Sequence, residues 1–179
     1  MKIVLLFIAF AFFSCEKLKP ETVNVPDYPN LEDVFNKQTS LLEDRKLVKE
    51  VWIDGKSETK TFDLDTVGWK KELSFLKEIN PNTPEYVGAF EKSEKNGIAQ
   101  LMLMEGEKGE LKSVSYLLED NNYTKLKATI HEEKEVYSHH RDFDLVFEYG
   151  LLKEYKISGY QKIVLKDTIV FDIQGVVIN

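Results

Sequence analysis

Cysteine is nearly absent from this chain of 179 residues, since Cys15 is the only one. A single cysteine forms no disulfide within its own chain, and it cannot supply the several thiolates of a structural zinc site. If Cys15 is covalently modified, no free thiol remains in the rest of the chain for nucleophilic chemistry. The scarcity therefore excludes disulfide-stapled folds, cysteine-ligated zinc and thiol catalysis.

A long hydrophobic run is also missing. The apolar stretch at residues 3–13 has eleven residues, whereas a membrane-spanning helix needs about 20. Lys2 precedes it and the small residue Ser14 follows it, which is the arrangement of a secretory signal peptide. The sequence therefore predicts a cleaved signal peptide over residues 1–14.

Residues 12–15 read Phe-Phe-Ser-Cys and resemble a bacterial lipobox, in the looser version found in the Bacteroidota. The resemblance implies a diacylglycerol thioether on Cys15, cleavage after Ser14 and acylation of the new amino group. The alternatives are an ordinary signal peptide with a coincidental cysteine, or a cysteine in a buried helix. Glu16 stands where an Asp would retain a lipoprotein in the inner membrane, so the outer membrane is favoured, and the periplasmic or surface face is left open.

Clusters of positive charge are missing as well. No run of Lys and Arg is longer than two residues, and the formal net charge is −7. Nucleic-acid affinity depends on neutralising phosphates, so the sequence predicts no nucleic-acid partner. Adhesion to anionic lipid head groups is disfavoured for the same reason, and the excess of acids serves to keep an envelope domain in solution.

The chain divides into three parts. After the signal peptide, residues 15–29 form the lipidated cysteine and a polar tether, which contains three of the five prolines and should act as an extended spacer. Residues 30–179 have the length of a single domain. We expect one domain held at a membrane by the anchor on Cys15.

The amino-terminal part of this domain predicts two helices and a hairpin. Asn30 can cap a helix that ends near Glu43, and Asp65 or Thr66 can cap a second one, which the prolines after residue 80 stop. Between them, residues 47–53 and 56–62 flank Asp-Gly, a strong hairpin signal.

Alternation of period two predicts strands from residue 85 onward. The expected ranges are 85–93, 98–105, 111–119, 123–134, 136–149, 151–165 and 168–177. Helices followed by strands joined by short loops indicate an α+β fold, with two helices packed on one curved antiparallel sheet of roughly seven to nine strands. Residues 98–104 are apolar on both sides, so either both sheet faces are packed or the sheet curls around an apolar groove.

Candidate chemistry is limited to one cluster. In a strand, His140, Asp142 and Asp144 share a face and could hold a divalent metal. The opposite register becomes apolar as the strand proceeds, so ordinary alternation toward solvent explains the cluster better. His131 is expected on the outward face of its own strand.

Catalytic motifs are otherwise absent. The sequence contains no G-x-S-x-G, no Gly-rich phosphate loop and no H-E-x-x-H. Catalysis is therefore unsupported, and no cofactor is predicted.

Residues 67–80 (VGWKKELSFLKEIN) and 149–162 (YGLLKEYKISGYQK) resemble segments of uncharacterised lipoproteins of the Bacteroidota. That resemblance implies an envelope address and no activity. The order of elements is also similar to that of the Lol carrier and receptor, whose curved sheets wrap helices around an acyl-binding cavity.

We expect a lipid-anchored envelope lipoprotein with a non-catalytic binding or scaffolding role, toward an apolar ligand or an envelope protein. The alternative is a metal-dependent hydrolase that uses His140, Asp142 and Asp144.

Overall fold

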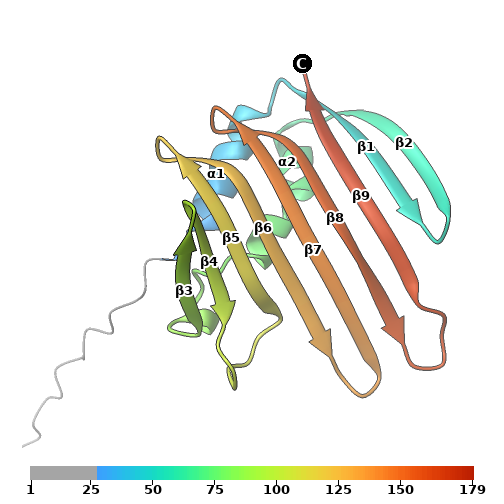
Figure 1. Ribbon diagram of the computed structural model, residues 1–179. Helices are drawn as coiled ribbons and strands as arrows, with labels where there is room; N and C mark the ends of the chain where they lie inside the picture. The colour runs from blue at the N-terminus through green and yellow to red at the C-terminus, as the bar shows by residue number, and fades with distance from the viewer. Residues whose placement is uncertain (1–27) are drawn as a thin grey trace, which may run out of the picture.

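A computed structural model describes residues 28–179, and Cys15 with its signal peptide lies outside them. Three α-helices and a short 3-10 helix pack on one antiparallel sheet of nine strands (Figure 1). This is the expected α+β class with an open sheet. The elements are α1 (Leu31–Leu41), β1 (Lys46–Ile53), β2 (Lys56–Asp63), α2 (Thr66–Glu72), α3 (Phe75–Glu78), η1 (Pro84–Tyr86), β3 (Phe90–Lys95), β4 (Ile98–Leu103), β5 (Leu111–Glu119), β6 (Asn122–Glu133), β7 (Tyr137–Glu148), β8 (Leu151–Ile163) and β9 (Ile169–Ile178).

The helix starts follow the capping residues of the sequence. The Glu32 backbone N–H donates to the side-chain oxygen of Asn30 (3.2 Å), and the Gly68 N–H donates to Asp65 (2.7 Å). The predicted second helix is divided at Ser74 into α2 and α3. The bend allows side chains from both pieces, among them Trp69 and Phe75, to be buried together in the core.

The segment 85–93 differs from the expected strand. Pro84 begins the 3-10 helix η1, and Gly88 takes a positive φ of 73°, so strand pairing starts only at Phe90. The later strands lie close to their predicted ranges, and residues 111–119 match β5.

The sheet is a meander that the first hairpin extends at one edge. Strands β3 to β9 lie side by side in chain order, and the β1–β2 hairpin joins them by pairing β1 with β9. Asp54 and Gly55 form the hairpin turn with positive φ angles of 47° and 86°, as the Asp-Gly signal predicts. Both edge strands, β2 and β3, carry many Lys and Glu residues, which discourages pairing with another chain.

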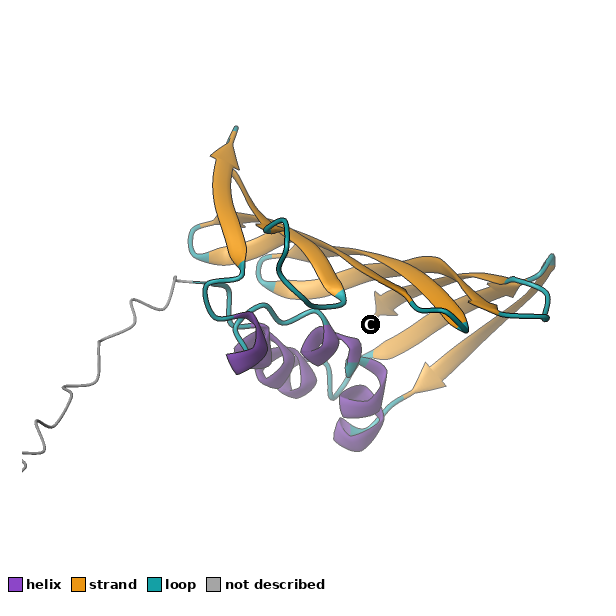
Figure 2. Ribbon diagram, turned by 90° about the horizontal axis from the view of Figure 1, so that it is seen from below, coloured by secondary structure: helices purple, strands orange, loops and turns teal. Residues whose placement is uncertain are grey.

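The two faces of the sheet differ. The face against the helices, called here the helix-side face, carries the hydrophobic core, which includes Leu101, Val114, Leu126, Leu145 and Tyr155. The opposite face, called the open face, is covered by no element of residues 28–179, and Figure 2 shows the helices gathered on one side only. Within residues 28–179, the alternative of a sheet packed on both faces is therefore wrong, and the alternative of a sheet curled around an apolar groove stays a prediction.

Buried amides fasten the helices to this sheet. The Gln38 side chain donates to the carbonyl of Gly150 (2.8 Å) and accepts from the N–H of Leu152 (2.9 Å), which ties α1 to the β7–β8 turn. Asn80 accepts from the N–H of Leu31 (3.1 Å) at the start of α1. These bonds satisfy buried polar groups and fix where the helices lie.

Candidate functional site: an uncovered groove beside the helices

The helices cover only part of the helix-side face. Buried residues of β7 lie in its second half, from Phe143 onward, and those of β8 lie in its first half, up to Ile157. Because the strands are antiparallel, the unburied halves lie together, and they run past the helices toward the β6–β7 and β8–β9 turns (Figure 1). We call this region the uncovered half of the face.

A groove of about 700 Å³ occupies the uncovered half. Its lining is partly apolar and partly polar, and most of it comes from β7, β8 and β9. The lining residues are Val136, Tyr137, His139, Arg141, Tyr160, Gln161, Ile163 and Phe171. We call it the apolar groove.

A second, polar hollow of about 340 Å³ adjoins the apolar groove, and Arg141 lines both. It lies between the segment from α3 to η1 and the sheet, and its lining includes Glu78, Thr83, Glu85 and Glu110. The two hollows together offer an apolar surface that ends at charged and hydrogen-bonding groups.

Two carboxylates lie beside the basic side chains at the junction of the two hollows. Arg141 Nη1 lies 2.7 Å from Glu78 Oε2, and His139 Nε2 lies 3.7 Å from Glu110 Oε2. His139 Nε2 and Thr83 Oγ1 are both buried without a hydrogen-bond partner in the protein. Buried polar atoms normally find a partner, so these two leave hydrogen-bonding capacity unused beside the junction.

Aromatic stacking sets the floor of the apolar groove. The rings of Tyr137 and His139 stack with centroids 5.6 Å apart and planes at 17°. Lys134 lies over the Tyr137 ring at 5.5 Å, and the Tyr137 hydroxyl donates to Glu132. A hydrogen bond from the hydroxyl to Glu132 and a cation over the ring keep this side chain in one position.

The end of the sheet next to the groove is rich in exposed apolar side chains. The turns β1–β2, β6–β7 and β8–β9 meet there, linked by backbone hydrogen bonds from Val164 to Val136 (3.0 Å) and from Asp54 to Val170 (3.1 Å). We call this part the hairpin end. Its exposed apolar residues are Trp52, Ile53, Val136, Ile163, Val164, Leu165, Ile169 and Val170. These side chains come from both faces of the sheet.

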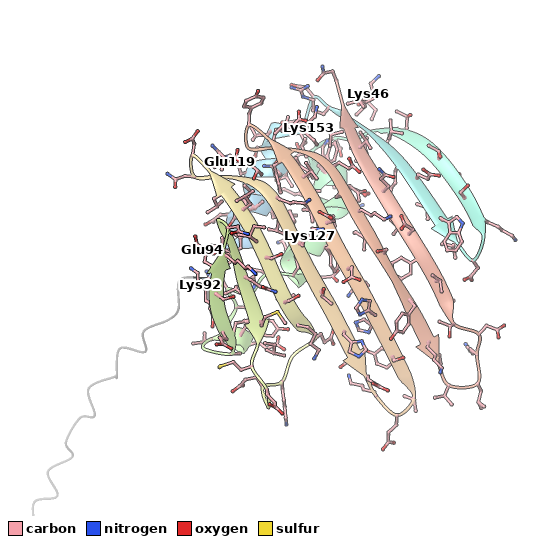
Figure 3. The ribbon with its side chains drawn as sticks, in the orientation of Figure 1. Lys46, Lys92, Glu94, Glu119, Lys127 and Lys153 are labelled. Carbon is pink, nitrogen blue, oxygen red and sulfur yellow. The ribbon has the colours of Figure 1, made fainter. Side chains whose placement is uncertain are left out.

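The metal candidates of the sequence lie on the open face. His140 donates to Asp142 (2.8 Å), Thr129 donates to the same carboxylate (2.8 Å), and Lys127 pairs with Asp144 (2.6 Å); Figure 3 labels Lys127 on this face. Among the residues that the structure describes, no group of three or more His, Cys, Asp or Glu side chains is placed to hold a metal ion. The three candidates therefore share a face without converging on one point.

The open face has a hollow of its own, of about 630 Å³, lined by Trp52 and Tyr160 together with polar residues that include Asp142, Lys156 and Asp172. Two of its charges are paired, since Lys156 lies 2.9 Å from Asp172. The hydrogen bond to Asp172 raises the pKa of Lys156.

A buried polar contact lies under the helices rather than in the groove. The Tyr155 hydroxyl donates to Glu72, which also pairs with Lys49 (2.7 Å). Burial of Tyr155, followed by its hydrogen bond to Glu72, raises the pKa of the phenol far above its ordinary value. This contact joins α2 to β1 and β8, and it belongs to the stability of the fold.

Sequence reasoning missed His139 and Arg141 as site residues. It assigned them to the apolar register of their strand, and they do lie on that face, but beyond the reach of the helices. One signal was available, since residues 137–142 place no large aliphatic side chain in that register.

Comparison with known proteins gives no assignment. No family model, no curated protein and no solved structure matches the chain. Among residues 28–179, no helix is both long enough and apolar enough to cross a bilayer.

Proposed function

We propose that this chain is a non-catalytic binding protein of the cell envelope, which holds an apolar ligand in the apolar groove. One observation carries the proposal: the helices leave half of one sheet face uncovered, and that half is hollowed and apolar. Hollowed apolar surface left open to solvent is a common place for a ligand to bind.

The dimensions and chemistry of the groove support a small amphipathic ligand. Ligand sites commonly have volumes of roughly 300–1,000 Å³, mainly apolar walls and a few polar groups that fix orientation. Here Ile163 and Phe171 supply apolar surface, while Arg141 and His139 stand at the polar junction. An acyl chain would lie along the strands, with its polar end at that junction.

The address is proposed together with the ligand. Lipidation of Cys15 would hold the domain at the outer membrane through the tether of residues 15–29. The resemblance to lipoproteins of the Bacteroidota favours the same location. Acylation at more than one position gives stable anchoring without a membrane-spanning helix.

A fluorescent fatty acid tests the groove. We expect the purified chain to bind it, and we expect Ile163→Asp to weaken binding at least tenfold, because a carboxylate in the groove must be desolvated. Val146→Asp is a matched control, since Val146 on the open face is 37 % exposed and Ile163 is 38 % exposed. Native mass spectrometry should show a co-purified lipid in the wild-type and Val146→Asp chains and none in Ile163→Asp.

Three outcomes would contradict the proposal in different ways. No binding by the wild-type chain removes the acyl ligand. Equal loss in both variants places the ligand outside the groove. If no lipid is found and the chain captures an envelope protein, and if Ile163→Asp abolishes that capture, the groove serves a protein partner instead.

The anchor has a separate test. We expect metabolically supplied palmitate to label the wild-type chain and Cys15→Ala to lose both the label and the membrane fraction. If Cys15→Ala still fractionates with membranes and the wild-type chain is never labelled, the lipoprotein hypothesis is wrong.

A further inference from the structure

Two of the three histidines of the chain face each other on the open face. His131 of β6 and His140 of β7 are directly opposed in the strand register, and their ring centroids are 5.8 Å apart with planes at 57°. The third, His139, points to the other face of the sheet. The pair lies outside the apolar groove and has no part in the proposed function.

Hydrogen bonds define the tautomer of each ring. His131 Nδ1 donates to the backbone carbonyl of His139 (3.1 Å), because a carbonyl can only accept. His140 Nε2 donates to the carboxylate of Asp142 (2.8 Å). The nitrogens left free to bind a metal are therefore His131 Nε2 and His140 Nδ1. A histidine that binds a metal through one ring nitrogen usually donates the N–H of the other nitrogen to a carbonyl or a carboxylate.

The spacing of the rings suits one shared ion. A metal lies about 2.0–2.1 Å from an imidazole nitrogen, and so about 3.2 Å from the ring centre. When two imidazole rings bind one ion at a tetrahedral or somewhat wider N–metal–N angle, their ring centres are about 5–6 Å apart. The observed 5.8 Å falls within that range.

Asp142 is itself held in place. Thr129 on β6 donates to its Oδ1 (2.8 Å), while His140 occupies its Oδ2. Asp142 thus acts as a positioning residue, which orients His140 without touching the metal. On the other side of His140, the Tyr160 ring stacks at 5.9 Å and 16°.

We infer that His131 and His140 form a two-histidine site for a transition-metal ion of the kind that imidazole prefers, such as Zn²⁺. His131 Nε2 and His140 Nδ1 are the ligands, and water fills the remaining positions. The site differs from the His140, Asp142 and Asp144 trio, because Asp144 is engaged by Lys127 and takes no part.

Titration calorimetry with Zn²⁺ on the purified, untagged chain tests the site. We expect one ion per chain, with His131→Ala and His140→Ala each weakening binding at least tenfold. Asp142→Asn should weaken it about tenfold, in line with other positioning carboxylates. His139→Ala is the matched control and should change the affinity less than twofold, as should Cys15→Ser.

Nuclear magnetic resonance gives a readout that does not depend on variants. Zn²⁺ should shift the ring signals of His131 and His140 and leave those of His139 in place. The site is overturned if the wild-type chain binds no Zn²⁺, or if the double variant of His131 and His140 binds as tightly as wild type. An unchanged affinity in Asp142→Asn would overturn the role given to Asp142.

Discussion

The covered and uncovered halves of the helix-side face belong to the same strands and follow the same alternation. Under the helices, Phe143 and Leu145 of β7 are at most 2 % exposed. A few residues earlier in the strand, Tyr137, His139 and Arg141 occupy the same register and are only partly buried. The difference lies in what packs over the strands, and it separates residues that stabilise the fold from residues that can meet a ligand.

This division predicts where substitutions should cost stability. A side chain enclosed by the core leaves a cavity when it is shortened, whereas one on the uncovered half returns to water. Matched substitutions in the two halves test that contrast.

Leu145→Ala should give the largest effect. Leu145 is fully buried under the helices, so we expect a loss of about 2–5 kcal/mol in the free energy of unfolding. Ile163→Ala removes a similar volume from the uncovered half and should cost less than about 1 kcal/mol. Chemical denaturation of both variants measures the difference. Similar losses in the two would mean that the uncovered half is also part of the core.

Gln38→Leu should have the next largest effect. The substitution keeps the volume but leaves the Gly150 carbonyl and the Leu152 N–H without partners in a buried place. Each unsatisfied group costs about 1–3 kcal/mol, so we expect a loss of at least about 2 kcal/mol. Gln161→Leu is the same substitution in the exposed part of β8 and should stay within about 0.5 kcal/mol. A small loss in Gln38→Leu would show that water can replace the amide.

The sequence predicted most of the elements because they depend on local signals. Asn30 and Asp65 cap their helices, Asp54 and Gly55 form the hairpin turn, and residues 111–119 are a strand from end to end. Alternation also assigned His140 and Phe143 to opposite faces, as the register shows. These features depend on neighbours a few residues apart.

The groove could not be predicted in the same way. Alternation tells which face His139 and Arg141 occupy, but the extent of helix cover depends on contacts far apart in the chain, such as Gln38 to Gly150. The pairing of β1 with β9 is equally distant in sequence. Without knowledge of these contacts, a strand face whose later residues are apolar is assigned to the core along its whole length.

Alkaline pH should weaken the covered half through Tyr155. The pKa of this phenol is raised in the folded state, while the unfolded chain ionises tyrosine near pH 10. Above that pH the unfolded state binds fewer protons than the folded state, so stability falls as pH rises. Tyr155→Phe should be less stable near neutral pH, but its decline above pH 10 should be shallower by about 1.4 kcal/mol per pH unit. Denaturation curves at several alkaline pH values measure both slopes. Parallel declines would mean that Tyr155 is not protected from ionisation.

The smallest stability effect is expected at the hairpin end. Leu165 is fully exposed and has a positive φ of 65°, which disfavours a leucine. Leu165→Asn should raise the free energy of unfolding by up to about 1 kcal/mol, because asparagine tolerates this conformation. Leu165 follows Ile163, which lines the apolar groove, by two residues. We therefore expect the same variant to weaken fatty-acid binding.

Tyr149 provides the comparison, since it is also fully exposed with a positive φ of 51°, but it lies in the β7–β8 turn at the opposite end of the sheet. Tyr149→Asn should gain a similar stability and leave ligand binding unchanged, because no part of the apolar groove reaches that turn. Thermal unfolding and fatty-acid titration of the two variants measure both quantities. If both variants bind as wild type does, the hairpin end takes no part in recognition, and the groove alone accounts for the ligand.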